Sequence, residues 1–384
     1  GLNLYVDGRF GSFSTNRLDK KELETLITNG IESTRYLAVD ESRMLADPAR
    51  YYKGGKPDLQ LFDKKLYEVN PDDKMAIARA AAEEVLGKDE RIISVDSSYS
   101  DGEGSSYRLI SNGFEGESKS TWCSVSASVS IKGEGEARPQ DYWYDSALFY
   151  DKLTKTGIGA KALERVLRKL GQKKAKSGKY TMVVDPMNVG NLLSPMLSAL
   201  YGSALQQKNS FLMDKLDTKV ASDLFTLRDE PHAIGANGSR YFDNEGVATE
   251  PRTVFDKGVL KTYFIDTYNG KKMDIAPTIS APSRLILTPG DKDLNGLVAD
   301  IKQGILVTGF NGGNSNSSTG DFSYGIEGFL IEDGKLTQPV NEMNVTGNMV
   351  TLWNSLVAVG NDPQPNRSWQ IPSLVFEGVD FSGL

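Results

Sequence analysis

Residues 186–207, PMNVGNLLSPMLSALYGSALQQ, contain no Asp, Glu, Lys, Arg or His. The apolar side chains of this stretch recur at the spacing of one helix face, which predicts a buried helix. They are Leu192, Leu193, Met196, Leu197 and Leu200. Pro195 is expected early in this helix, where a missing backbone N–H is tolerated. By itself, an uncharged helix of this kind indicates only a protein core.

Two long blocks in the C-terminal half indicate which kind of protein this core belongs to. They are SRYFDNEGVATEPRTVFDKGVLKTYFIDTYNGKK (239–272) and STGDFSYGIEGFLIEDGKLTQPVNEMNVTGN (318–348). Both closely resemble the TldD/PmbA family, whose members are known as modulators of DNA gyrase and as TldD/TldE peptidases. The resemblance extends over most of the chain. It implies an α+β fold in which an N-terminal α+β domain is followed by a strand-rich C-terminal domain.

The catalytic members of this family carry a zinc motif, H-E-x-x-x-H, on the buried helix. The resemblance places six residues at the motif positions: Ser194, Pro195, Met196, Leu197, Ser198 and Ala199. A catalytic zinc ion needs about three protein ligands and an open position, and neither Ser194 nor Ala199 supplies an imidazole. Pro195 cannot replace a Glu general base. The family's third ligand is a Cys near the C-terminus, and residues 366–376, NRSWQIPSLVF, contain none.

The chain therefore resembles the PmbA (TldE) branch of the family, the partner without metal. That resemblance implies a subunit with no catalytic residues, metal or cofactor of its own. Its expected partner is a TldD-like metallopeptidase subunit that holds zinc, or a second copy of itself. The expected substrates are unfolded peptides or peptide precursors, and the expected compartment is the cytoplasm.

Composition limits the remaining possibilities. The 384 residues are 25% charged and 39% hydrophobic, which is ordinary for a soluble globular protein of two or three domains. The net charge of −7 argues against non-specific nucleic-acid binding, which depends on neutralising phosphates. No run is long and apolar enough to predict a membrane span. The single cysteine, Cys123, excludes an intrachain disulfide and fits a reducing compartment.

The local patterns divide the chain into three parts. We expect an N-terminal α+β domain over 1–145, a central helical and linking region over 146–225, and a β-rich domain over 226–384. Because the chain opens with Gly1 inside a strand-like stretch, the natural N-terminus is expected to have been removed. The predicted helices are 19–36, 71–87 and 158–170, and the predicted strands before residue 186 are 91–98, 106–114, 120–131 and 180–185. Hairpins are predicted around Asp7-Gly8, Asp256-Lys257-Gly258 and Glu332-Asp333-Gly334, a turn-rich link at 132–145 and a flexible loop at 309–321.

Asp243 and Glu245 form a close acidic pair in YFDNEG. Residues two apart on a strand share a face, so both carboxylates could point into a substrate cleft, and a hydrolase could use them as acid and base. The favoured interpretation is structural: Asp243 organises the turn into Gly246, and Arg240 or Arg252 pairs with one of the two carboxylates.

Asp321, Phe322 and Ser323 follow the Gly/Asn/Ser-rich loop, and the family resemblance implies that they line the rim of the substrate cleft. The alternative is a turn in which Asp321 accepts backbone N–H bonds. His232, the only histidine, is better explained as a loop residue than as a metal ligand or base. Thr156-Gly157-Ile158-Gly159 faintly resembles a phosphate loop, but glycines at a helix start explain it better.

Two other functions stay open at this point. The chain could be a stand-alone homodimeric protein that binds extended peptides by adding a strand to an exposed sheet edge. It could also be a metal-independent hydrolase that uses Asp243 and Glu245. A paralogue that carries H-E-x-x-x-H and co-purifies with the chain would distinguish the subunit from the stand-alone protein.

Overall fold

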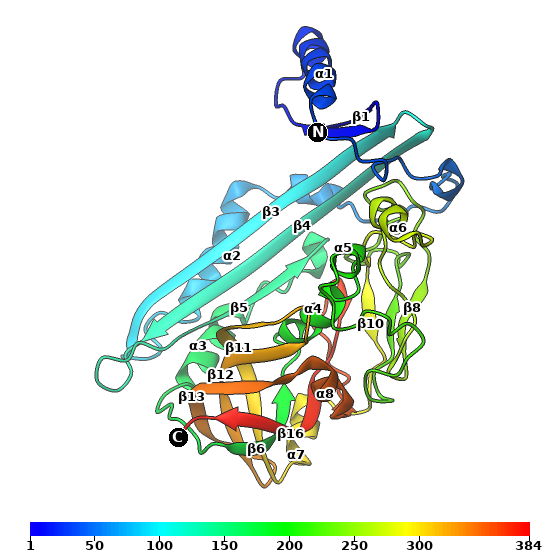
Figure 1. Ribbon diagram of the computed structural model, residues 1–384. Coiled ribbons are helices and arrows are strands. Elements are labelled where there is room, and N and C mark those ends of the chain that lie inside the picture. The colour runs from blue at the N-terminus through cyan, green and yellow to red at the C-terminus, as the bar shows by residue number, and fades with distance from the viewer.

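The computed structural model describes residues 1–384 (Figure 1). The chain opens with a hairpin of β1 (Leu2–Val6) and β2 (Arg9–Phe13), followed by α1 (Lys20–Arg35). The Asp19 carboxylate caps α1 by accepting the Glu22 N–H at 3.0 Å. The hairpin and the helix expected here are therefore confirmed. Both lie at one end of the molecule, beyond the end of a long pair of strands (Figure 1).

That pair, β3 (Ile92–Ile110) and β4 (Phe114–Ile131), forms one hairpin of 19 and 18 residues. The prediction of three separate strands in this region was wrong, because the Gly- and Ser-rich stretch after residue 98 continues β3. Gly102 pairs with Trp122 there, and the glycine leaves room for the indole ring.

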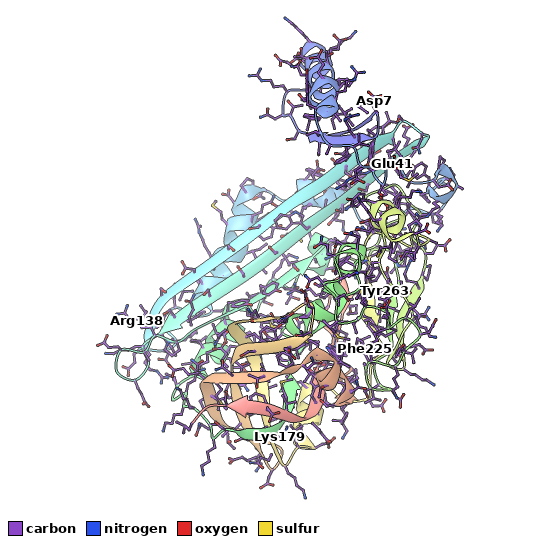
Figure 2. All side chains as sticks on the ribbon, in the orientation of Figure 1. Asp7, Glu41, Arg138, Lys179, Phe225 and Tyr263 are labelled. Atoms are coloured by element: carbon purple, nitrogen blue, oxygen red, sulfur yellow. The ribbon has the colours of Figure 1, made fainter.

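A third strand, β5 (Gln140–Ala147), pairs antiparallel with β4. The predicted link at 132–145 is therefore a turn only as far as Pro139. Arg138 lies in that turn, at the far end of the long hairpin (Figure 2). The aromatic residues 142–144, which we expected in the link, belong to β5. Their side chains alternate between the two faces of the sheet, as in any strand.

Helices α2 (Pro71–Glu83) and α3 (Ile158–Leu167) cover one face of this sheet, as the helical periods predicted. The strand period of two places five β4 side chains in the core beneath them: Cys123, Val125, Ala127, Val129 and Ile131. The intervening serines of β4 lie on the opposite face. Short 3₁₀ turns flank these elements: η1 (Pro48–Arg50), η2 (Lys64–Tyr67) and η3 (Tyr150–Lys152).

The C-terminal half is built on two further sheets. A six-stranded sheet has the order β13-β12-β11-β6-β16-β14, and a five-stranded one has the order β15-β10-β7-β8-β9. The strands of the first are β6 (Gly178–Val184), β11 (Gln303–Ser315), β12 (Asp321–Glu332), β13 (Lys335–Asn348), β14 (Leu356–Val359) and β16 (Leu374–Ser382). Those of the second are β7 (Leu227–Asp229), β8 (Arg252–Asp256), β9 (Val259–Leu260), β10 (Leu285–Leu287) and β15 (Trp369–Gln370). The α+β architecture with a strand-rich C-terminal part is confirmed.

Short helices complete this half: α4 (Gly190–Ser198), α5 (Gly202–Gln206), α6 (Thr267–Met273), α7 (Leu294–Ala299) and α8 (Met349–Asn354). The two hairpins predicted at 256–258 and 332–334 are confirmed. Lys257 and Asp333, like the glycines that follow them, have positive φ angles, as a tight hairpin turn requires. The predicted loop at 309–321 was too long, because β11 continues to Ser315 and only 316–320 connects it to β12.

The uncharged stretch 186–207 differs from the prediction in two respects. It forms two short helices, since the Gly202 N–H bonds to the carbonyl oxygen of Phe264 at 2.7 Å at the break between them. Residues 186–189 form a turn, so α4 begins only at Gly190 and Pro195 lies inside the helix. The N–H that Pro195 lacks would have bonded to the carbonyl of Asn191, an exposed residue that water can reach. The division of the chain at residues 145 and 225 stays a prediction.

Candidate functional site

Helix α4 carries the positions where the family resemblance would place a metal. Its apolar face is fully buried in the main core through Leu192, Leu193 and Met196. Ser194 is exposed, Pro195 is half-buried and Ala199 is buried at 1% exposure. The solvent-facing side of α4 is therefore a surface of small, uncharged side chains.

No three His, Cys, Asp or Glu side chains come together anywhere in the chain in a way that could hold a metal ion. At the motif positions of α4 the available groups are a hydroxyl, a proline ring and a methyl. These groups do not match the imidazole, thiolate and carboxylate ligands that zinc takes in proteins. The donor set on α4 therefore does not fit the zinc site implied by the family.

His232 lies in the loop between β7 and β8 and is half-buried. Its Nε2 atom is 3.1 Å from Thr249 Oγ1, and its ring packs against Tyr241 with 5.0 Å between centroids. Burial is the largest influence on this imidazole and lowers its pKa, so neutral histidine is favoured. These contacts agree with the interpretation of His232 as a loop residue.

Asp243 is buried at 2% exposure and its carboxylate accepts three backbone N–H groups. Oδ1 accepts those of Glu245 at 2.8 Å and Val247 at 3.0 Å, and Oδ2 accepts that of Ser280 at 3.0 Å. This geometry matches the structural interpretation, in which Asp243 organises the turn around Gly246. The expected pairing with an arginine was wrong for Arg240, whose guanidinium donates to Ser283 and to the carbonyl oxygens of Ala281 and Pro282.

Glu245 points to the first turn of α6. Its Oε2 atom accepts the Thr267 N–H at 2.9 Å and the Thr267 hydroxyl at 3.0 Å. Burial raises the pKa of the Glu245 carboxyl, and the nearby Asp243 charge raises it further. Arg252 forms no ion pair with either carboxylate, and its Nε atom is buried without a hydrogen-bond partner. Both carboxylates of the acidic pair thus accept structural hydrogen bonds, which does not favour a role as acid and base of a hydrolase.

The segment Asp321–Ser323 begins β12, beside the short 316–320 connection. Asp321 is exposed, and hydrogen bonds from Asn348 and Thr319 lower the pKa of its carboxyl. Phe322 is buried at 5% exposure and stacks on Tyr324 with 5.5 Å between centroids. The exposed Ser323 pairs with Thr346 in the sheet. Two of the three side chains are therefore accessible, and no contact links this segment to Asp243 or Glu245.

A charged cluster that the sequence did not reveal joins the three-stranded sheet to the C-terminal half. Lys169 Nζ lies 3.2 Å from Asp141 Oδ2 and 2.7 Å from Glu327 Oε1, and Arg165 Nε lies 3.2 Å from Asp141 Oδ1. The cluster borders a cavity of about 350 Å³ whose wall includes Asn188, just before α4. The four residues come from α3, β5, β12 and the turn after α3, so no local sequence pattern connects them.

A second feature missed by the sequence analysis is a cavity of about 710 Å³ between residues 44–50 and the α6 region. Arg50 lines it, and its Nη1 atom is buried without a hydrogen-bond partner. Thr267, the residue held by Glu245, lies in the same wall. Neither Asp243 nor Glu245 reaches the cavity directly.

Comparison with known proteins agrees with this architecture. The model of the PmbA/TldA metallopeptidase C-terminal domain matches residues 177–383, and that of the PmbA/TldA metallopeptidase central domain matches residues 64–170. The chain belongs to the PmbA/TldD family. The resemblance drawn from the two C-terminal blocks is thereby confirmed.

Two PmbA relatives align with the whole chain, and a TldD relative aligns with about half of it. A metalloprotease PmbA homolog of Haemophilus influenzae is 28% identical over 391 residues, covering 100% of this chain and 85% of the relative. The metalloprotease PmbA of Escherichia coli is 27% identical over 387 residues, with the same coverage of 100% and 85%. A metalloprotease TldD homolog of Buchnera aphidicola is 25% identical over 215 residues, 52% of this chain and 44% of the relative.

Solved structures agree with the fold. A candidate modulator of DNA gyrase from Bacteroides thetaiotaomicron is 74% identical, with a TM-score of 0.99 over 100% of this chain and 87% of that one. TldE from Thermococcus kodakarensis is 22% identical, with a TM-score of 0.81 over 98% of this chain and 88% of that one. The second likeness concerns the fold alone. None of the chain's helices has the length and hydropathy needed to cross a bilayer.

Proposed function

We propose that this chain is the non-catalytic, metal-free subunit of a TldD/TldE-type metallopeptidase complex. A TldD-like partner would carry the zinc ion and hydrolyse the peptide bond. This chain would close the chamber, stabilise the partner and help admit unfolded peptides or peptide precursors. We propose the cytoplasm as the compartment, which the family resemblance implies and with which the lone, buried Cys123 is compatible.

One observation carries the proposal: Ser194, Pro195 and Ala199 occupy the positions where the family resemblance requires two imidazoles and a carboxylate. Helix α4 otherwise packs as core helices usually do, with its apolar face in the main hydrophobic core. Its folding therefore does not depend on metal ligands. The simplest role for a chain with this fold but without zinc-binding side chains is to assemble with a related chain that has them.

The proposal is tested by producing the chain alone and together with a TldD-like paralogue that carries H-E-x-x-x-H. Zinc content and cleavage of casein or of an unstructured peptide are then measured for each preparation. We expect the chain alone to bind no stoichiometric zinc and to cleave nothing. The co-expressed pair should co-purify, contain zinc and cleave in a chelator-sensitive manner.

The matched control replaces both histidines of the paralogue's motif with alanine. That complex should still assemble but should lose zinc and activity, because assembly depends on surfaces and cleavage on ligands. Zinc-dependent cleavage by the isolated chain would contradict the proposal.

A second candidate function has one structural observation in its favour. β3 is the outer strand of the β3-β4-β5 sheet, and its 19 residues offer an unusually long edge for pairing with an extended peptide. A stand-alone homodimeric peptide-binding protein could use this edge without any catalytic partner. Size-exclusion chromatography of the chain with and without the TldD-like paralogue separates the two ideas, since only the subunit would exchange a homodimer for a heteromeric complex.

A further inference from the structure

A cavity of about 450 Å³ lies where the end of β5, the 230–240 loop, β10 and the segment before β15 meet. Its wall contains Gln60, Leu148, Phe149, Lys152, Ile234, Gly235, Ala236, Asn237, Arg284, Asn366, Arg367 and Gln370. Three of these residues are cationic and none is acidic. In a chain with a net charge of −7, a cavity lined by cations alone is unexpected.

The three cations have no anionic partner within the chain. Lys152, Arg284 and Arg367 form no ion pair, and their side-chain nitrogens donate no hydrogen bond. Asp151, which precedes Lys152 in the chain, pairs with Lys65 at 2.6 Å. Glu230, whose charge acts on Arg284, pairs with Arg228 at 2.7 Å.

The two arginines are also partly removed from water. Arg284 Nε is buried and lacks a hydrogen-bond partner. Burial is the largest influence on both guanidinium groups and lowers the pKa of each. Arg367 is held over the Tyr144 ring at 4.8 Å from its centroid. A half-buried charge without a counterion is costly, and an anionic ligand would remove that cost.

The rest of the wall indicates what else the ligand contains. Leu148, Phe149 and Ile234 provide an apolar side, and Ile234 is 60% exposed although it is large and aliphatic. The carboxamides of Gln60 and Asn366 make no hydrogen bond within the chain. Such groups suit the amide of a peptide, and the apolar side suits a terminal side chain. The volume exceeds what a free phosphate ion would fill.

We propose that this cavity binds the C-terminal carboxylate of an extended peptide, with Arg284 and Arg367 as the carboxylate-binding pair and Lys152 at the rim. Guanidinium groups match a carboxylate through paired N–H donors, and capture of a chain terminus is an established way to recognise peptides. The inference rests on the proposed peptide-handling function and specifies which part of the peptide this chain holds.

The test is fluorescence anisotropy with the full chain and an N-terminally labelled, unstructured peptide that ends in leucine. The same peptide is used with a free carboxylate and with a C-terminal amide. We expect the amide to bind roughly tenfold or more weakly, the loss typical of a charge-assisted hydrogen-bond pair. Arg367→Gln, Arg284→Gln and Lys152→Gln should each weaken the free acid and leave the amide unchanged. Lys335→Gln, an equal change of charge at an exposed position of β13 outside the cavity wall, should affect neither.

The outcomes separate this inference from the function on which it rests. If the two peptides bind equally well, the cavity does not bind the C-terminal carboxylate, although the chain still binds peptides. Competition by inorganic phosphate without any effect of amidation assigns the cavity to a small anion and also overturns the site. If neither peptide binds, the peptide-handling function itself fails. Lys152 is exposed, so its variant reports on the site even if an arginine variant fails to fold.

Discussion

Glu84, at the end of α2, holds the first turn of α3 through Gly159, whose N–H its Oε2 atom accepts at 2.8 Å. The same carboxylate accepts the N–H groups of Gly157 at 2.6 Å and Ala160 at 3.2 Å. An anion at the start of a helix satisfies N–H groups that have no partner within the helix. The glycine pattern at 156–159 is therefore a helix start whose anion-binding position is filled by the chain's own side chain.

Replacing Glu84 with alanine should destabilise the fold. Three backbone donors would lose their acceptor, and we expect a loss of about 2 kcal/mol in the free energy of unfolding. Urea denaturation followed by circular dichroism measures this loss. Glu83→Ala is the control, because Glu83 is exposed on the same helix and makes no hydrogen bond through its side chain. Equal midpoints for the two variants would contradict this account.

Gly159 itself should not tolerate a side chain. A Cβ atom at this position would lie 1.9 Å from the Ala81 carbonyl oxygen of α2, so the two helices would have to separate. We expect Gly159→Ala to cost about 3 kcal/mol or more. Gly190→Ala, at the first position of α4, meets nothing within 4 Å and should be neutral or slightly stabilising. Thermal melting of both proteins compares them, and similar melting temperatures would argue against close α2–α3 packing.

Local signals predicted much of this fold. The cap Asp19, the glycine turns at 258 and 334 and the alternation along β4 each act within a few residues, so the sequence alone indicates them. The length of β3 could not be predicted in this way. Gly102 disfavours a strand locally. Its reason lies on the partner strand, where the Nε1 atom of Trp122 is 3.0 Å from the place that a Cβ atom at position 102 would take.

In the candidate site, too, only the features set by neighbouring residues could be predicted from the sequence. The absence of metal ligands on α4 is a property of residue types and could be recognised directly. The turn made by Asp243 was also predictable, because two of its three donors lie within four residues. Other contacts join residues that are distant in the chain. Ser280 donates to Asp243, Lys169 pairs with Glu327, and Arg284 lines the same cavity as Arg367. No periodicity or motif brings residues so distant in the chain together.

Lys169 should contribute strongly to the junction between α3 and the C-terminal sheet. It is buried at 8% exposure, and its ammonium group donates to Glu327 at 2.7 Å and to the Gln140 carbonyl oxygen at 2.9 Å. Removing it leaves Glu327 without a partner, so we expect Lys169→Ala to cost about 3 kcal/mol. Glu327→Gln should cost less, about 1 kcal/mol, since Lys169 keeps Asp141 and the carbonyl.

The control for the junction is an exposed ion pair of similar length. Lys179 and Asp380 lie 2.8 Å apart on the surface, where water and salt screen the charges. Lys179→Ala should change the free energy of unfolding by no more than about 0.5 kcal/mol. Figure 2 labels Lys179, which lies near the start of β6 in the C-terminal sheet. If the Lys169 and Lys179 variants lose equal stability, the buried cluster has no special role in joining the two parts.

The pH dependence of stability should include a contribution from Asp185, which lies between β6 and the turn into α4. Asp185 is buried at 5% exposure, and its Oδ1 atom accepts both N–H groups of Asn188, at 3.0 and 2.7 Å. Burial is nevertheless the largest influence and raises the pKa of the carboxyl above its ordinary value. The native state therefore binds this proton more tightly than the unfolded state does.

Asp185 therefore contributes most to stability at low pH. Below the ordinary carboxyl pKa of about 3.9 the group is protonated in both states, and its contribution to stability is fully present. As the pH rises through the raised native pKa, the buried group must ionise and the contribution is lost. Asp185→Asn cannot ionise and keeps an oxygen that accepts from Asn188. We therefore expect the variant to be more stable than the parent at neutral pH, with the difference shrinking as the pH falls.

Urea unfolding across this pH range measures the difference in stability. The control is Asp214→Asn, at an exposed position whose side chain makes no hydrogen bond, and it should show no such trend. A difference that is constant with pH, or a variant less stable at neutral pH, would mean that the Asn188 contacts outweigh the cost of burying the charge.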